Sequence, residues 1–190
     1  IKNISLLGSK GSGKTTLAEA MLYECGVIKR RGTVEAKNTT CDYFPVEKEY
    51  GYSVFSTVFY AEFLNKKLNV IDCPGSDDFV GNAVTALNVT DTGVILIDGQ
   101  YGVEVGTQNI FRTCEQLKKP IIFAINQLDG EKADFDNSLL QLKEHYGSKV
   151  VPIQFPINCG PSFNSMIDVL LMKQYTWGPD GGVPTITEIP

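Results

Sequence analysis

The sequence has 190 residues, of which 43% are hydrophobic and 21% are charged, and its formal net charge is −5. This composition suits one globular domain with a substantial core, and the acidic balance disfavours binding of nucleic acid through a broad basic face. The longest apolar runs have the length of a strand, and no signal peptide opens the chain, so a membrane partner is not expected.

The cysteines and the first residue give two further expectations. Five cysteines are an odd number, they are widely spread, and no two of them have Cys-x-x-Cys spacing, which argues against a disulfide framework and against a zinc site. A reducing, cytoplasmic location is therefore predicted. The sequence starts with Ile1 and not with methionine, so we expect a fragment, and we expect that fragment to be monomeric.

The first apolar run, residues 4–7, leads into a glycine-rich segment and then into a helix-compatible segment that ends near residue 25. This order matches the phosphate-loop pattern G-x-x-x-x-G-K-[ST] in its strand-loop-helix context. Backbone N–H groups in such a loop surround a β-phosphate at the N-terminus of the helix. Lys14 would bridge the β- and γ-phosphates, and the Thr15 hydroxyl would bind Mg²⁺. The alternative is an ordinary glycine-rich turn. The residues predicted to bind nucleotide here are Gly8, Ser9, Lys10, Gly11, Ser12, Gly13, Lys14, Thr15 and Thr16.

Residues 27–52 lack hydrophobic periodicity and are predicted to form a long loop. Loops of this length in compact domains are usually functional or mobile, so we assign this one to the site and expect it to be disordered without ligand. It contains the densest basic cluster of the chain, Lys29-Arg30-Arg31. A solvated loop and a phosphate-contacting role are both open for that cluster.

The rest of the chain alternates between strand-like and helix-like segments. Residues 54–60 and 68–72 read as an antiparallel hairpin, and the apolar runs 94–98 and 121–126 read as central parallel strands. Helices are expected at 135–146 and 163–172, with a last strand at 150–154 and a loop at 178–182. The predicted fold is α/β, with three layers around a mostly parallel sheet that includes one antiparallel hairpin strand.

Polar motifs follow the predicted strands at their carboxyl ends, where open α/β sheets bind ligands. Asp72 closes a strand and is expected to hold Mg²⁺ through water, and Gly75 can turn a backbone N–H toward a γ-phosphate. Asn126, Gln127 and Asp129 form the predicted base-reading motif. The Asp129 carboxylate would accept hydrogen bonds from guanine N1–H and its amine, and adenine would leave it mismatched. A simple strand-ending turn is the alternative.

Four segments together resemble elongation factor G: the entry into Gly-Lys-Thr-Thr, residues 47–54, residues 69–79 and residues 152–157. The resemblance implies the GTP-binding domain of a translational GTPase that uses GTP, GDP and Mg²⁺ and promotes translocation on the ribosome, where it meets the factor-binding region of the large subunit. It makes Ser53 a switch ligand of Mg²⁺. Residues 1–157 would be the P-loop domain, and 158–190 its continuation or the truncated start of an inserted subdomain. The family's fifth guanine contact is not found.

Several functional positions depart from the family. Ser76 replaces the histidine that orients the attacking water, so Gly75 and Ser76 mark a degenerate catalytic position. Gly11 replaces an aspartate, Gln127 replaces a lysine, and Ser53 replaces a threonine. A neutral serine hydroxyl cannot supply an imidazolium. We therefore expect a factor that binds GTP but hydrolyses it slowly or not at all.

Three other interpretations stay open from the sequence. The first is an active ribosome-stimulated GTPase in which Asp77, Asp78 or a ribosomal phosphate replaces the histidine. The second is a ribosome-protection factor that uses GTP as a residence switch. The third is an unrelated phosphate-loop ATPase or kinase.

Overall fold

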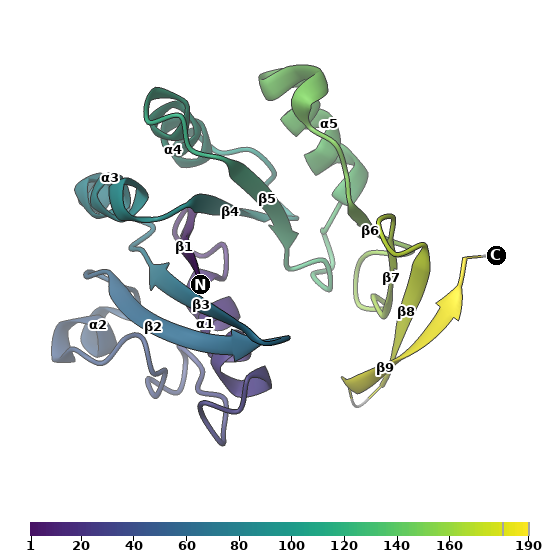
Figure 1. Ribbon diagram of the computed structural model, residues 1–190, viewed down its shortest axis with the longest axis horizontal. Helices are drawn as coiled ribbons and strands as arrows, with labels where there is room; N and C mark the ends of the chain where they lie inside the picture. The colour runs from purple at the N-terminus through teal and green to yellow at the C-terminus, as the bar shows by residue number, and fades with distance from the viewer. Residues whose placement is uncertain (180, 190) are drawn as a thin grey trace. The chain divides into compact units, whose positions relative to one another are not determined.

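A computed structural model of the chain describes residues 1–179 and 181–189. The chain forms two compact units (Figure 1): the first consists of Ile1–Ile97 and Glu104–Ala124, and the second of Asp98–Val103 and Ile125–Pro190. All five cysteines are unpaired thiols. None of the helices in the described part of the chain is both long and apolar enough to cross a membrane. A domain boundary between residues 157 and 158 stays a prediction.

A five-stranded, mostly parallel sheet in the order β2-β3-β1-β4-β5 forms the centre of the first unit. β1 pairs in parallel with both β3 and β4, whereas β2 runs antiparallel to β3. This arrangement confirms the predicted hairpin and the predicted parallel strands. The strands are β1 (Lys2–Gly8), β2 (Thr57–Phe63), β3 (Lys66–Asp72), β4 (Thr92–Asp98) and β5 (Ile121–Asn126).

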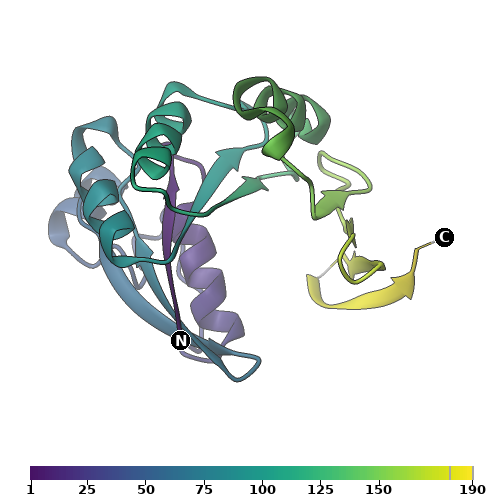
Figure 2. The same ribbon diagram turned by 45° about the horizontal axis from the view of Figure 1, so that its top comes forward.

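Helices cover both faces of this sheet, as Figures 1 and 2 show. Leu6 and Leu96 pack on the side of α1 (Lys14–Glu24), and their neighbours Leu7 and Ile95 pack on the side of α3 (Val80–Val89) and α4 (Val105–Gln116). Successive side chains of a strand point to opposite faces, so a strand covered on both sides is apolar throughout. The three-layer prediction is confirmed.

The expected loop 27–52 contains a short helix, α2 (Pro45–Tyr50), which the sequence analysis missed. Proline suits the first helical turn, and the Glu47 carboxylate accepts the N–H of Phe44 at 3.2 Å, which completes a capping arrangement. Glu47 also accepts the N–H groups of Val54 and Phe55, at 3.0 and 3.1 Å. Because the N–H groups of Val54 and Phe55 are bonded to Glu47, they are not available for pairing with another strand. β2 therefore begins at Thr57 and not at residue 54 as predicted.

The second unit contains α5 (Phe135–Tyr146), as predicted, and a four-stranded antiparallel sheet in the order β6-β7-β8-β9. A single turn of 3-10 helix, η2 (Gly147–Lys149), follows α5, and a similar turn, η1 (Asp77–Phe79), precedes α3 in the first unit. The strands of the second sheet are β6 (Gln154–Pro156), β7 (Ser165–Asp168), β8 (Lys173–Gly178) and β9 (Gly181–Glu188).

Two predictions for this unit are wrong. The strand expected at 150–154 begins only at Gln154, and the helix expected at 163–172 is β7 followed by a turn. The Asp168 carboxylate accepts the N–H of Leu171 at 2.8 Å and the side-chain amide of Gln154 at 2.8 Å. These bonds close a turn that competes with the helix, and Met172 ends it with a φ of 53°. The loop expected at 178–182 is only partly found, since Gly178 ends β8 and Gly181 and Gly182 begin β9, and its residue 180 lies outside the described residues.

Candidate nucleotide-binding site

The predicted phosphate loop connects β1 to α1 in a tightly turned conformation. Gly11 and Gly13 have φ values of 85° and 91°, in the left-handed region that glycine tolerates. A Cβ on Gly8 would lie 2.4 Å from the carbonyl oxygen of Leu96, so the loop starts in close contact with β4. The structure therefore contains the strand-loop-helix unit that the sequence predicts.

Lys14 is almost fully buried beneath this loop. Its ammonium donates hydrogen bonds to the carbonyl oxygens of Gly8, at 3.0 Å, and Ser9, at 2.9 Å. Burial lowers its pKa, and the carboxylate of Asp72 acts in the opposite direction. The side chain is thus a hydrogen-bond donor held inside the loop, as expected for a group that contacts phosphate.

The three predicted magnesium ligands lie together beside the loop. The Thr15 hydroxyl donates to Asp72 Oδ2 at 2.9 Å and lies 3.1 Å from the hydroxyl oxygen of Ser53. Ser53 in turn donates to Asp42 Oδ1 at 2.7 Å. Asp42, which is buried, was missed by the sequence analysis because no spacing rule links a loop aspartate to a serine eleven residues later.

These residues fit a magnesium ion. Asp72 Oδ1 is buried and has no hydrogen-bond partner among the described residues, although a buried carboxylate oxygen normally has one. Hydroxyl and carboxylate oxygens are the donors that Mg²⁺ prefers, often with water between. Burial raises the pKa of Asp72 to about 7, against the opposing effects of the Thr15 hydrogen bond and the Lys14 charge. A bound cation would favour the ionised form.

Replacing Asp72 by asparagine should flatten the pH dependence of stability in the nucleotide-free protein with a chelator present. The carboxyl keeps its proton up to about pH 7 in the folded chain, and an ordinary aspartate loses it near 3.8. The stability that the protonated carboxyl contributes is present at low pH and is lost as the pH rises toward 7, by about 2–3 kcal/mol between pH 5 and pH 8. Urea unfolding at the two pH values measures it. Equal losses in both proteins would contradict the assignment.

Gly75 lies directly against the phosphate loop. A Cβ at this position would be 2.4 Å from Lys14 Nζ and 2.8 Å from the backbone nitrogen of Lys10, so no larger residue fits without movement. The next residue, Ser76, is half-buried, and its hydroxyl lies 3.4 Å from Asp78 Oδ2. The side chain of Asp77, another suggested catalytic group, lies outside the described part of the structure.

Two buried glutamates hold the segment that carries Ser53, and the sequence analysis missed both. Glu19, on α1, accepts the N–H groups of Gly32, at 2.9 Å, and Thr40. Glu47, on α2, accepts the three N–H groups described above. Each glutamate is only 1% exposed. Carboxylates that accept backbone N–H groups form strong hydrogen bonds, so these two fix the path of residues 32–55.

Lys10 adds a further contact between the loop and this segment. Its ammonium lies 3.7 Å from the centroid of the Tyr52 ring, next to Ser53. A cation over an aromatic face is attracted by the ring. Tyr52 and Ser53 therefore contact the phosphate loop directly. Disorder of residues 27–52 without ligand stays a prediction.

The predicted base-reading motif forms a tight turn in the second unit. The N–H of Gly99 donates to the Asn126 carbonyl at 2.8 Å. The N–H of Gly130 closes the turn by donating to the carbonyl of Gln127, whose φ is 57°. The N–H of Gly160 donates to the carbonyl of the buried Leu128 at 2.8 Å. Asp129 is exposed at the tip of this turn. An exposed carboxylate on a turn fixed on both sides suits recognition of a planar base.

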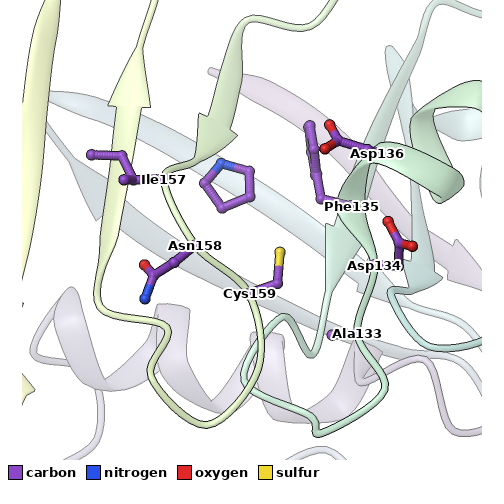
Figure 3. Close-up of a pocket in the computed structure, with 8 residues that line it drawn as sticks. Ala133, Asp134, Phe135, Asp136, Ile157, Asn158 and Cys159 are labelled. Atoms are coloured by element: carbon purple, nitrogen blue, oxygen red, sulfur yellow. The ribbon is translucent and has the colours of Figure 1, made fainter.

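A cavity of about 210 Å³ also lies in the second unit (Figure 3). Residues 133–136, at the start of α5, line one side of it, and residues 156–159, at the end of β6 and beyond, line the other. None of the predicted site residues borders it. Its lining residues are Ala133, Asp134, Phe135, Asp136, Pro156, Ile157, Asn158 and Cys159.

Comparison with known proteins identifies the family to which this chain is related. The family model of the elongation factor Tu GTP binding domain matches residues 1–184. The chain is 34% identical to an elongation factor G-like protein of Thermotoga maritima over 180 residues, which is 95% of this chain and 26% of that protein. It is 33% identical to elongation factor G of Mycoplasma genitalium over 174 residues, 92% of this chain and 25% of the relative.

The chain is also similar to a protein of known structure. A crystal structure of a Thermus thermophilus protein superposes with a TM-score of 0.92 at 34% identity, covering 100% of this chain and 28% of the other. The chain spans about a quarter of the length of the curated relatives that it matches. The resemblance to elongation factor G is thereby confirmed, and the chain belongs to the elongation factor Tu GTP-binding domain family.

Proposed function

We propose that this chain binds GTP and GDP together with Mg²⁺. The observation that carries the proposal is the cluster of Thr15, Ser53 and Asp72 beside the phosphate loop, with one buried Asp72 oxygen left without a partner among the described residues. Thr15 and Ser53 would bind the cation directly, and Asp72 would bind it through water. Backbone N–H groups of Gly8–Thr15 and Thr16 would surround the phosphates, and Lys14 would neutralise them.

The residues at the catalytic position favour slow hydrolysis of GTP. When bound, Mg²⁺ supplies positive charge to the phosphate oxygens. Gly75 can place its backbone N–H next to Lys14, where a γ-phosphate would be contacted. Ser76 can only hydrogen-bond a water molecule, and its hydroxyl is already within reach of Asp78. We infer that GTP orders the segment around Ser53 and that turnover is slow.

The names of the relatives suggest the role of the whole protein. Proteins called elongation factor G match more than nine-tenths of this chain. We propose that the chain is the GTP-binding domain of a cytoplasmic translation factor that binds the ribosome and promotes translocation. Residues 158–190 would continue this domain or begin a subdomain inserted into it.

Selection of guanine is the property that separates this proposal from a phosphate-loop ATPase. Replacing Asp129 by asparagine should lower GTP affinity by about 10- to 100-fold, because two donors of guanine lose a charged acceptor. Affinity for ATP, weak at the start, should not change. Titration of the full-length protein with fluorescent GTP and ATP analogues measures both.

A matched control removes the same charge nearby. Glu131 is exposed and lies two residues further along the chain, so Glu131→Gln should leave GTP affinity unchanged. Tighter binding of ATP than of GTP by the unmodified protein would refute the proposed function. Equal losses in both variants would mean that Asp129 acts only through overall charge.

A further inference from the structure

The basic cluster Lys29-Arg30-Arg31 makes none of the contacts described above for the nucleotide site. All three side chains are exposed, and the structure gives none of them an ion pair with a described residue. This concentration of positive charge is unusual in a chain whose net charge is −5. Exposed cations without acidic neighbours remain available for an external anion.

The backbone on both sides of the cluster is fixed. Before it, the N–H groups of Val27 and Ile28 donate to the carbonyl of Leu22 at the end of α1, at 2.9 and 3.3 Å. After it, the N–H of Gly32 donates to the buried carboxylate of Glu19 at 2.9 Å. The three cations therefore sit on a short span anchored to α1 at each end, which reduces the entropy lost when a partner binds.

The following loop extends this basic surface and closes on itself. A Cβ on Gly32 would lie 2.4 Å from the carbonyl oxygen of Asn38, so the backbone at the two ends of this loop is in close contact. The Asn38 side chain accepts the N–H of Thr33 at 2.8 Å. Lys37 adds a fourth exposed cation, and Glu35 is the single acidic residue between 29 and 40.

The chemistry of this surface favours RNA over protein or membrane. Large exposed hydrophobic residues occur only at its borders, at Val27 and Tyr43. A stable protein interface usually has buried apolar anchors, and a membrane-binding surface inserts apolar side chains. A phosphate backbone needs only cations and polar donors at fixed positions.

We propose that Lys29, Arg30 and Arg31 bind the phosphate backbone of a structured RNA. The inference rests on the proposed function, because the ribosome supplies that RNA. The cluster is too small to recognise an RNA sequence. It would instead raise the affinity of the factor for the RNA and help to orient it, and this part of the affinity would depend strongly on salt.

The test measures binding of the full-length protein, loaded with a non-hydrolysable GTP analogue, to purified ribosomes over a range of salt concentrations. The variant carries Lys29→Glu, Arg30→Glu and Arg31→Glu. We expect its affinity at low salt to fall at least about tenfold and the slope of log affinity against log salt to become shallower by about 2. A Gln variant at the same positions should show a smaller loss of affinity.

A control variant carries Lys66→Glu, Arg112→Glu and Lys118→Glu. These three cations are exposed elsewhere in the first unit, and the change in net charge is the same. The control should keep most of the affinity, and both variants should bind GTP like the unmodified protein, which shows that they are folded. Equal affinity and slope in the cluster variant and the control would overturn this inference and leave the proposed function intact.

A photo-crosslinking residue at position 30 identifies the partner. Crosslinks to ribosomal RNA support the inference, whereas crosslinks only to ribosomal protein overturn it in favour of an acidic protein surface. Failure of the unmodified protein to bind ribosomes in any nucleotide state would overturn the proposed function and this inference together.

Discussion

Replacing Ser76 by histidine in the full-length protein should raise ribosome-stimulated phosphate release by about 10²–10³-fold. An imidazole at this position reaches further than a hydroxyl and can carry a positive charge at physiological pH. Gly75, the preceding residue, already touches Lys14 and the phosphate loop, so the new side chain would start beside the reacting phosphate. Single-turnover phosphate release with and without ribosomes measures the effect.

The control for this substitution is Asp78→Asn. The hydroxyl of Ser76 lies 3.4 Å from Asp78, so this pair is the described candidate for a substitute catalytic group. We expect the Asp78 variant to hydrolyse GTP as slowly as the unmodified protein. Fast turnover by the unmodified protein, lost in the Asp78 variant, would show that Asp78 replaces the histidine and that the slow-hydrolysis proposal is wrong.

Replacing Glu47 by glutamine should destabilise the segment that carries Ser53 by about 2–4 kcal/mol. The Glu47 carboxylate accepts three backbone N–H groups, from Phe44, Val54 and Phe55, and is 1% exposed. A glutamine amide loses the negative charge and turns an N–H₂ group toward one of these donors. Ser53 directly precedes Val54, so binding of Mg²⁺ and GTP should weaken as well.

Hydrogen exchange at residues 53–57 and urea unfolding of the chain measure this change. The matched control is Glu49→Gln, because Glu49 lies on the same helix but is exposed. Its effect on the free energy of unfolding should stay within about 0.5 kcal/mol. If the two variants exchange at the same rate around Ser53, Glu47 does not hold this segment in solution.

The predictions that the structure confirms rest on local or strictly periodic patterns. The phosphate loop needs only neighbouring residues, since its glycines, Lys14 and Thr15 all fall within the eight positions that join β1 to α1. The central strands are covered on both faces, so their apolar character is continuous in the sequence. The bounds of α5 also follow from local signals, since Asp134 caps its start and Gly147 follows its end.

The failed predictions concern short segments whose partners are far away in the sequence. Residues 163–172 contain enough apolar side chains for a helix, and short apolar runs do not distinguish helix from strand. Pairing of β7 with β8 and the turn fixed by Asp168 decide the outcome. Neither interaction is visible before the chain has folded.

The sequence by itself determined the central strands, the phosphate loop and the family, because each depends on a pattern of residues that lie close together in the sequence. Only the tertiary structure showed how the long loop before β2 is held. Glu19 and Glu47 become its anchors, and Asp42 the partner of Ser53, because folding buries their carboxylates and leaves particular N–H and hydroxyl groups as the donors within reach.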